Sequence, residues 1–291
     1  MKRRAVFLLG LVLGALAQAA IHQDVFRLPV TVTDAAGRAV EHTIVVTVFS
    51  DPANPKPAPV LVLNHGRAAE AALRAQLGRA KFTDASHYLV RHGFIVAVPT
   101  RIGYGITAGP DVEYSGDCKR KNYAPGYAAA AAQTLAVLQA VSQRWPDAAA
   151  PDRAVVMGQS YGGTTAVTIA AQNPPTVQAA INFAGGGGGN PKTQPQKPCD
   201  PQQLERLFGG YGRTAKVPML WVYAENDMYF GPEHPRKWHA AFEQSGGRAE
   251  FVQFPPHGED GHSLFTRHPE AWKPKVTAFL KAQGFGVKEA R

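Results

Sequence analysis

Cysteine is scarce in this sequence: 291 residues contain only two. Two cysteines exclude a small domain held together by several disulfides, and they exclude a cysteine-rich zinc module. Charged residues make up only 18% and hydrophobic residues 45%, a balance that excludes a disordered chain, a collagen-like repeat and a polytopic membrane protein. A chain of this length has room for a large core, since it buries roughly 75% of its unfolded surface on folding.

The N-terminal segment has the pattern of a secretory signal peptide. Three basic residues at positions 2–4 precede an apolar run over 5–16, which carries no charge. This run is shorter than the roughly 20 residues that span a bilayer, and positions 17–19 show the small-x-small pattern that signal peptidase needs. We predict that residues 1–19 are removed, that residues 20–291 form one domain, and that no stable membrane insertion remains. An uncleaved membrane anchor is the alternative.

Acidic residues are outnumbered by basic ones, 22 against 31, which gives a formal net charge of +9. Loss of the three basic residues at positions 2–4 leaves 28 against 22, a net charge of +6. The mature chain has one tight basic cluster, Lys119-Arg120-Lys121, and no aromatic residues interleave with it to form a basic stripe. Nucleic acid is therefore not an expected partner, although a basic surface is able to attract anionic substrates.

Export would place the two cysteines in an oxidising compartment, either the periplasm or the exterior of the cell. Cys118 and Cys199 both lie in polar segments rich in Pro and Gly, and neither has the flanks of a catalytic nucleophile. We predict that they form a disulfide, with two separate free thiols as the alternative. A bridge that closes a loop of about 80 residues stabilises the fold by about 4 kcal/mol in the chain-entropy model.

Short apolar runs alternate with helical patterns along the chain. Two alternating segments, 25–32 and 43–49, flank a turn and predict an antiparallel edge of a sheet. Continuous apolar runs, typical of strands buried on both faces of a parallel sheet, cover residues 60–63, 94–98, 154–157, 179–183, 219–223 and 250–254. Helical patterns separate these runs within residues 69–91, 127–144, 161–172, 236–244 and 272–283. The alternation predicts one doubly wound α/β domain with a mostly parallel, eight-stranded sheet flanked by helices.

The strongest chemical signal is Gly158-Gln159-Ser160-Tyr161-Gly162, which matches the pattern G-x-S-x-G. It lies between a predicted strand and a predicted helix, where this motif forms a tight turn. The turn needs small residues two positions before and after the serine, and it presents the serine hydroxyl above the sheet. Ser160 is therefore the predicted nucleophile. A structural serine in a glycine-rich turn is the alternative.

A serine hydroxyl needs a histidine base, and the histidine needs a carboxylate that holds its tautomer. In this architecture the acid and then the base follow the serine, each after a strand. Asp227 is the predicted acid because it lies farthest past its strand, with Glu225 as the alternative. His262 is the predicted base because its neighbours are small, with His257, directly after two prolines, as the alternative.

Acyl transfer also needs two backbone donors aimed at the oxyanion. The motif predicts the N–H of Tyr161, directly after the nucleophile, and the N–H of Arg67, in the loop after the first parallel strand. Aromatic residues are candidates for the substrate pocket: Tyr104 follows the second parallel strand, and Tyr229, Phe230 and Trp238 follow the acid. Helix packing is the alternative for the last three. The His and Asp residues are scattered and form no metal motif, and hydrolysis of this kind requires no cofactor.

Together these motifs resemble the α/β-hydrolase superfamily and, within it, the dienelactone-hydrolase-like group of exported serine hydrolases. The similarity covers nearly all of residues 25–285. The matching segments are Asn64–Gly66, Arg101–Gly105, Gly158–Gly163, Asn182–Gly186, Leu220–Asp227 and Asp260–His262. By this resemblance Ser160, Asp227 and His262 form the catalytic triad. True dienelactone hydrolases carry cysteine at the nucleophile position, so the resemblance implies a fold and hydrolysis rather than that substrate.

The interval between residues 183 and 217 is short and has the composition of a loop, which predicts no large cap domain and an open site. The glycine-rich run 185–189 and the segment around Cys118 are expected to roof this site in part. The predicted function is a serine carboxylesterase that cleaves a small-molecule or polymer-borne ester through an acyl-enzyme intermediate. A serine peptidase or amidase related to prolyl oligopeptidases and a catalytically inactive binding module on the same fold are the alternatives.

Overall fold

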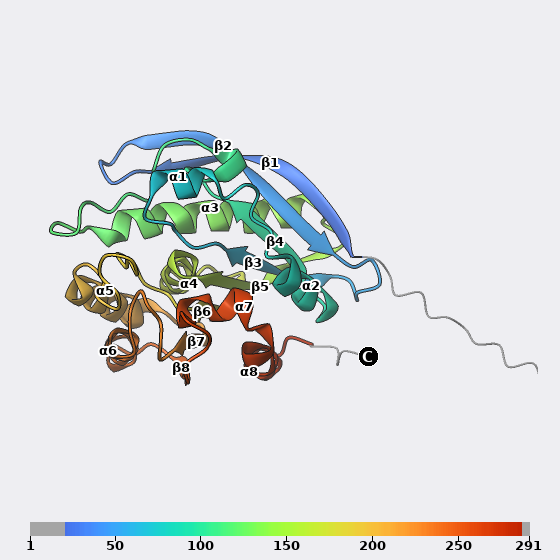
Figure 1. Cartoon of the computed structure of the whole chain (residues 1–291). Helices are drawn as coiled ribbons and strands as arrows, with labels where there is room; N and C mark the ends of the chain where they lie inside the picture. Colours follow the sequence, from blue (N-terminus) through green and yellow to red (C-terminus); the bar gives the residue numbers. More distant parts are fainter. Residues whose placement is uncertain (1–20, 287–291) are drawn as a thin grey trace, which may run out of the picture.

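The computed structural model describes residues 21–286, and within them the strands form one sheet (Figure 1). The predicted signal peptide, residues 1–19, lies outside the described residues. The strands are β1 (His22–Thr33), β2 (Ala39–Ser50), β3 (Ala58–Asn64), β4 (Ile95–Thr100), β5 (Ala149–Gln159), β6 (Val177–Phe183), β7 (Met219–Ala224) and β8 (Ala249–Phe254). Each overlaps one of the runs identified in the sequence, so the predicted eight-stranded sheet is confirmed. The interpretation of 250–254 as a strand buried on both faces is wrong, because β8 lies at the edge of the sheet and none of its residues is fully buried.

The strand order explains how the functional loops meet. The sheet runs β1-β2-β4-β3-β5-β6-β7-β8, with β1–β2 and β2–β4 antiparallel and all other pairs parallel. The antiparallel edge predicted over 25–32 and 43–49 is therefore confirmed. In a parallel sheet the carboxyl ends of the strands lie along one edge, where open α/β folds bind their ligands. The loops after β3, β5, β7 and β8 consequently gather at that edge.

Helices cover both faces of the sheet, as a doubly wound fold requires. They are α1 (Ala71–Ala75), α2 (Thr83–Arg91), α3 (Tyr123–Arg144), α4 (Tyr161–Gln172), α5 (Pro201–Thr214), α6 (Glu233–Gln244), α7 (Leu264–Arg267) and α8 (Pro269–Ala282). Along β3, Val60 and Val62 join the core under α3 and α4, whereas Leu61 and Leu63 join the core under α2 and α8. Within residues 21–286, none of the helices combines the length and the hydropathy of a membrane span.

The segment after β6 differs from the sequence prediction. The prediction of a loop over residues 183–217 is wrong in part, because this segment contains the helix α5, which packs beside α4 and α6. The Asp200 carboxylate accepts the N–H of Gln203 at 3.0 Å and caps this helix, whose first turn holds a proline. Of the glycines that weaken its helical signal, Gly212 has a packing role, since a side chain there would collide with the backbone of Phe242 in α6.

Candidate active site

The predicted nucleophile occupies a strained turn between β5 and α4. Ser160 has φ +58° and ψ −123°, a conformation that non-glycine residues rarely adopt. Its backbone N–H donates to the carbonyl of Phe183 at 2.8 Å. A side chain at Gly158 would collide with the backbone of Gly162, so the close turn needs the small residues that the motif supplies. Ser160 is only 8% exposed, and it lines a cavity at the carboxyl edge of the sheet.

The predicted acid and base meet after β7 and β8. His262 Nδ1 lies 2.9 Å from Oδ2 of Asp227, and the Nδ1–H donates to that oxygen. The other carboxylate oxygen of Asp227 accepts the backbone N–H groups of Tyr229 at 2.7 Å and Phe230 at 3.0 Å. Asp227 is fully buried. These three bonds fix the orientation of the carboxylate and direct His262 Nε2 away from it.

The two alternative residues lie elsewhere. Glu225 is exposed and pairs with Arg236 at 3.6 Å. The Nδ1 atom of His257 faces the carbonyl of Pro255 at 2.7 Å. Neither residue contacts the Asp227–His262 pair through a hydrogen bond in the described part of the chain.

Among the described residues His262 makes no direct hydrogen bond to Ser160, but its loop contacts the residue next to the nucleophile. The Gln159 amide, next to the nucleophile, donates to the His262 carbonyl at 3.2 Å. The imidazole stacks on Tyr229, with ring centres 4.0 Å apart and planes 25° apart, and it meets the edge of Phe230 at 5.2 Å. These two aromatic rings hold the plane of the imidazole beside the nucleophile loop. The absence of a direct bond to Ser160 does not argue against catalysis, because catalytic hydrogen bonds are often long before substrate binds.

The predicted oxyanion donors lie on the two loops that flank Ser160. Tyr161 is the first residue of α4, so its N–H has no acceptor within the helix. Gly66 packs against the nucleophile, because a Cβ atom placed on it would lie 3.1 Å from the Ser160 Cβ. The loop that carries the Arg67 N–H therefore passes directly beside Ser160.

A buried ion pair stabilises the loop that carries the Arg67 N–H. Arg101 and Glu113 are both fully buried, with Nε and Oε1 2.5 Å apart. Arg101 Nη1 donates to the His65 carbonyl at 2.8 Å, and its backbone N–H donates to His65 Nε2 at 3.2 Å. Burial and then the charge of Arg101 hold the pKa of His65 well below its usual value. The ring is therefore neutral, and its Nδ1–H donates to the Gly66 carbonyl at 2.8 Å.

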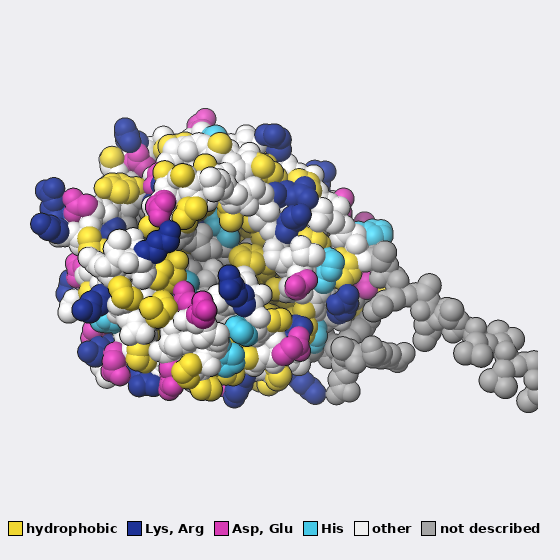
Figure 2. All heavy atoms as spheres, in the orientation of Figure 1, with side chains coloured by type: hydrophobic (Ala, Val, Ile, Leu, Met, Phe, Trp, Pro, Cys, Tyr) yellow, Lys and Arg dark blue, Asp and Glu magenta, His cyan; other side chains and the backbone are white. Residues whose placement is uncertain are grey.

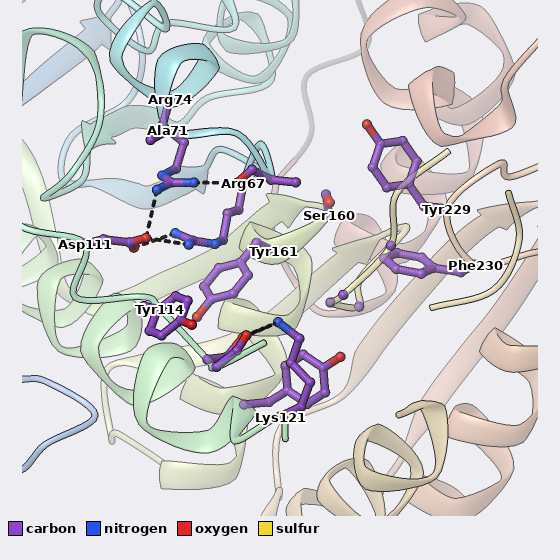
Figure 3. A pocket seen from close by; sticks show the side chains of 18 residues that line it. Arg67, Ala71, Arg74, Asp111, Tyr114, Lys121, Ser160, Tyr161, Tyr229 and Phe230 are labelled. Atoms are coloured by element: carbon purple, nitrogen blue, oxygen red, sulfur yellow. Dashed lines mark hydrogen bonds and ion pairs between the residues drawn. The ribbon is translucent and has the colours of Figure 1, made fainter. Parts of the chain in front are cut away.

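The cavity has a volume of about 390 Å³ and opens on the face shown in Figure 2, which is hollowed near its middle. Tyr229 and Phe230 line it, as Figure 3 shows. The sequence also predicts Tyr104 as a pocket residue, but its side chain is buried beneath the residues that line the cavity. It is 2% exposed, its hydroxyl donates to Glu113 Oε2 at 2.5 Å, and it accepts Arg67 Nη1 at 3.3 Å. Tyr104 therefore supports Arg67 instead of facing the cavity.

A disulfide joins Cys118, before α3, to Cys199, before α5. The Cys199 N–H donates to the Gly188 carbonyl at 3.0 Å, and the Tyr123 hydroxyl donates to the Cys199 carbonyl. Glycines 186–189 and the segment before α3 both contribute to the cavity wall. The bridge consequently ties together two loops that roof the site in part.

Two residues that the sequence analysis did not single out hold the site together. Gln159, described above, connects the nucleophile turn to the histidine loop. One carboxylate oxygen of Asp260 accepts the N–H groups of His262 and Met228, each at 2.9 Å, and so connects the base loop to the acid loop. The position of Asp260 before a short helical turn is a capping signal that the sequence already contains. Within residues 21–286, no group of three or more His, Cys, Asp or Glu side chains is arranged to hold a metal ion.

Comparison with known proteins identifies the same architecture. A family model, Hydrolase_4, described as serine aminopeptidase S33, matches residues 55–210. No curated protein sequence matches the chain. One similar solved structure is an acylaminoacyl peptidase from Pyrococcus horikoshii, with a TM-score of 0.67 and 14% identity over 94% of this chain and 43% of that chain. A second is a provisionally named dienelactone hydrolase from Klebsiella pneumoniae subsp. pneumoniae MGH 78578, with a TM-score of 0.58 and 16% identity over 90% of this chain and 99% of that chain. A third is an acetyl xylan esterase from Paenibacillus sp. R4, with a TM-score of 0.56 and 16% identity over 90% of each chain. At these identities the likeness shows a shared fold, that of the α/β-hydrolases.

Proposed function

Because the chain belongs to the Hydrolase_4 family of serine aminopeptidase S33-type hydrolases, we propose that it cleaves carboxylic esters with Ser160 as nucleophile. His262 is the general base in this proposal, and Asp227 holds it in place. One observation carries the proposal: the 2.9 Å hydrogen bond between His262 Nδ1 and a buried Asp227 oxygen, on loops adjoining a serine held at positive φ.

The geometry supports a two-step reaction. In the first step His262 Nε2 takes the hydroxyl proton of Ser160 as the oxygen attacks the ester carbonyl, and it then returns the proton to the departing alcohol. In the second step the same nitrogen takes a proton from water as the water oxygen attacks the acyl-enzyme carbonyl, and it then returns this proton to the Ser160 oxygen as the acid is released. Asp227 keeps the Nδ1–H tautomer throughout, so that Nε2 is free to accept.

Negative charge develops on the carbonyl oxygen in both steps. The N–H groups of Arg67 and Tyr161 are the proposed donors to this oxygen. Loss of one such donor reduces kcat by roughly 100- to 1,000-fold in serine hydrolases. The Arg101–Glu113 pair fixes the loop that carries the first donor, which keeps this donor oriented before the substrate arrives.

A second candidate function is the hydrolysis of aminoacyl amides. The description of the matched family as serine aminopeptidase and the likeness to an acylaminoacyl peptidase favour it. Both reactions use the same triad, but an amine leaves only after it has been protonated, which makes the ester the less demanding substrate. We therefore place ester cleavage first.

A fluorophosphonate probe on the folded protein tests the proposal directly. We expect labelling of Ser160, located by peptide mass spectrometry, and turnover of a short-chain 4-nitrophenyl ester. Both signals should disappear in Ser160→Ala and persist in Ser142→Ala, a serine on α3 that does not line the cavity. Aminoacyl 4-nitroanilides in the same assay distinguish the second candidate. A folded protein that neither reacts with the probe nor cleaves esters would contradict the proposal.

We further propose that the mature chain begins after residue 19 and works in the periplasm or outside the cell. The Cys118–Cys199 bridge supports this, because structural disulfides persist in oxidising compartments. N-terminal sequencing of the protein from its native cells, together with fractionation, tests both statements.

A further inference from the structure

The cavity beside Ser160 carries more positive charge than its surroundings neutralise. Three cationic side chains line it, Arg67, Arg74 and Lys121, but only one carboxylate does, that of Asp111. Arg67 donates to both oxygens of Asp111 at 2.7 Å, and Arg74 donates to Oδ2 of the same carboxylate at 2.8 Å. The single negative charge of Asp111 thus pairs with two guanidinium groups, which leaves one positive charge of the cluster without a counter-charge. Lys121 lines the same cavity but does not pair with Asp111, as Figure 3 shows.

The Lys121 ammonium has only neutral partners in the described part of the chain. Its Nζ donates to the Gly116 carbonyl at 2.5 Å and to the Ser115 hydroxyl at 3.4 Å. The nearby Asp117 is 61% exposed and pairs with Arg120 at 3.9 Å. Burial and then the charge of Arg67 lower the pKa of Lys121, and the smaller opposing effect of the Asp117 charge does not cancel them. An ammonium has three donors, so one donor of this cavity-lining lysine is left without an acceptor among the described residues.

The backbone around Lys121 is held in place, which restricts the positions that its ammonium can reach. The Gln203 side chain donates to the Lys121 carbonyl at 2.5 Å. Three residues earlier the Cys118–Cys199 bridge anchors the same loop to the segment before α5. Lys121 is half-buried, in contrast to its exposed neighbour Lys119. This position differs from that of a lysine on a solvated surface.

We propose that Lys121, together with Arg67 and Arg74, forms an anion subsite beside Ser160, and that the preferred substrate is an ester that carries a carboxylate. The inference rests on the proposed ester hydrolysis and deepens it. Partly desolvated cations gain most from an ionised partner, because charge-assisted hydrogen bonds are roughly twice as strong as neutral ones. Glycines 186–189 on the cavity wall leave room for the substrate, since they have no side chains.

Two matched substrate pairs test the subsite and show which part of the ester bears the charge. The first pair compares the mono-4-nitrophenyl ester of adipic acid with the 4-nitrophenyl ester of adipamic acid, so that the acyl group ends in a carboxylate or an amide. The second pair compares 4-acetoxybenzoate with 4-acetoxybenzamide, so that the leaving group bears the difference. We expect the carboxylate member to have at least about tenfold higher kcat/KM in one of the pairs.

The ratio of kcat/KM within a pair is the readout for variants, because the fraction of folded enzyme cancels in it. We expect Lys121→Gln to lower the ratio by about fivefold or more, and Lys121→Arg to retain most of it. Lys119→Gln is the matched control: it removes the same charge from the same loop, but at an exposed residue, and should leave the ratio unchanged.

The outcomes separate the subsite from the function on which it rests. Equal kcat/KM for both members of both pairs would overturn the anion subsite while leaving ester hydrolysis intact. The same holds for a carboxylate preference that Lys121→Gln does not reduce. Failure of the parent protein to cleave any of the four esters would instead overturn the proposed function.

Discussion

Glu113→Gln should both destabilise the protein and slow it. The substitution keeps the shape of the side chain but leaves the guanidinium of Arg101 buried opposite a neutral amide, with neither residue exposed to water. Removing one partner of a buried ion pair costs about 3–5 kcal/mol. A domain of this size loses about 2 °C in Tm for each kcal/mol. We therefore expect a fall in Tm of about 6–10 °C.

The effect on catalysis follows from what Arg101 holds. Its side chain and backbone both donate to His65, which precedes the loop that carries the Arg67 N–H. A guanidinium that shifts toward water releases this loop and misaligns one oxyanion donor. At temperatures where parent and variant are both folded, kcat should fall by up to about 100-fold. KM should change much less, because the proposed donor acts mainly in the transition state.

Thermal unfolding by circular dichroism and steady-state hydrolysis of a 4-nitrophenyl ester measure the two effects. Glu270→Gln is the matched control, since Glu270 is an exposed glutamate that pairs with Lys273 on α8. Its Tm should change by less than about 1 °C. A Glu113→Gln variant with the Tm and kcat of the parent would refute the argument that the buried pair supports the oxyanion loop.

Three further changes have defined outcomes. Asp227→Asn should lower kcat by about 10³- to 10⁴-fold without unfolding the protein, because the amide no longer fixes the His262 tautomer; a loss below tenfold would contradict the assigned role. Replacing Cys118 and Cys199 together by alanine should cost about 4 kcal/mol in urea unfolding, and a cost near zero would show that the bridge does not constrain the unfolded chain. The unfolded state takes up a proton on His65 near pH 6.5, whereas the folded state does not because burial and Arg101 lower the pKa of His65. Stability should therefore fall below pH 6.5 by up to about 1.4 kcal/mol per pH unit, and His65→Gln should show a shallower slope in urea titrations from pH 7 to pH 5.

The sequence is sufficient to predict the centre of the sheet because the central strands bury both faces. Runs such as 60–63 and 219–223 contain no polar residue, and the structure buries nearly every position in them. The loops after these strands then meet at one edge, which brings Asp227 to His262 although 35 residues separate them. Order along the chain and the direction of the strands are enough to place both residues beside the nucleophile turn.

Features that depend on partners far away in the sequence are harder to predict. The glycines of α5 weaken its helical pattern, and the reason for Gly212, its close packing on α6, becomes visible only in three dimensions. Tyr104 follows a strand as a pocket residue would, but Glu113 and Arg67 hold its hydroxyl behind the wall. Lys121 belongs to an ordinary basic cluster in the sequence, and only the fold places its ammonium in the cavity.

The bridge between Cys118 and Cys199 also changes how the chain responds to cutting. It closes a covalent ring that contains α3, β5, Ser160, α4 and β6. A single break in any loop inside this ring releases no fragment, because the two pieces stay joined through sulfur. A gel without reductant would show such a nicked protein at its full mass, and a gel with reductant would show two pieces. A fragment that carries Ser160 and lies wholly between Cys118 and Cys199 is therefore released only by two cuts within the ring.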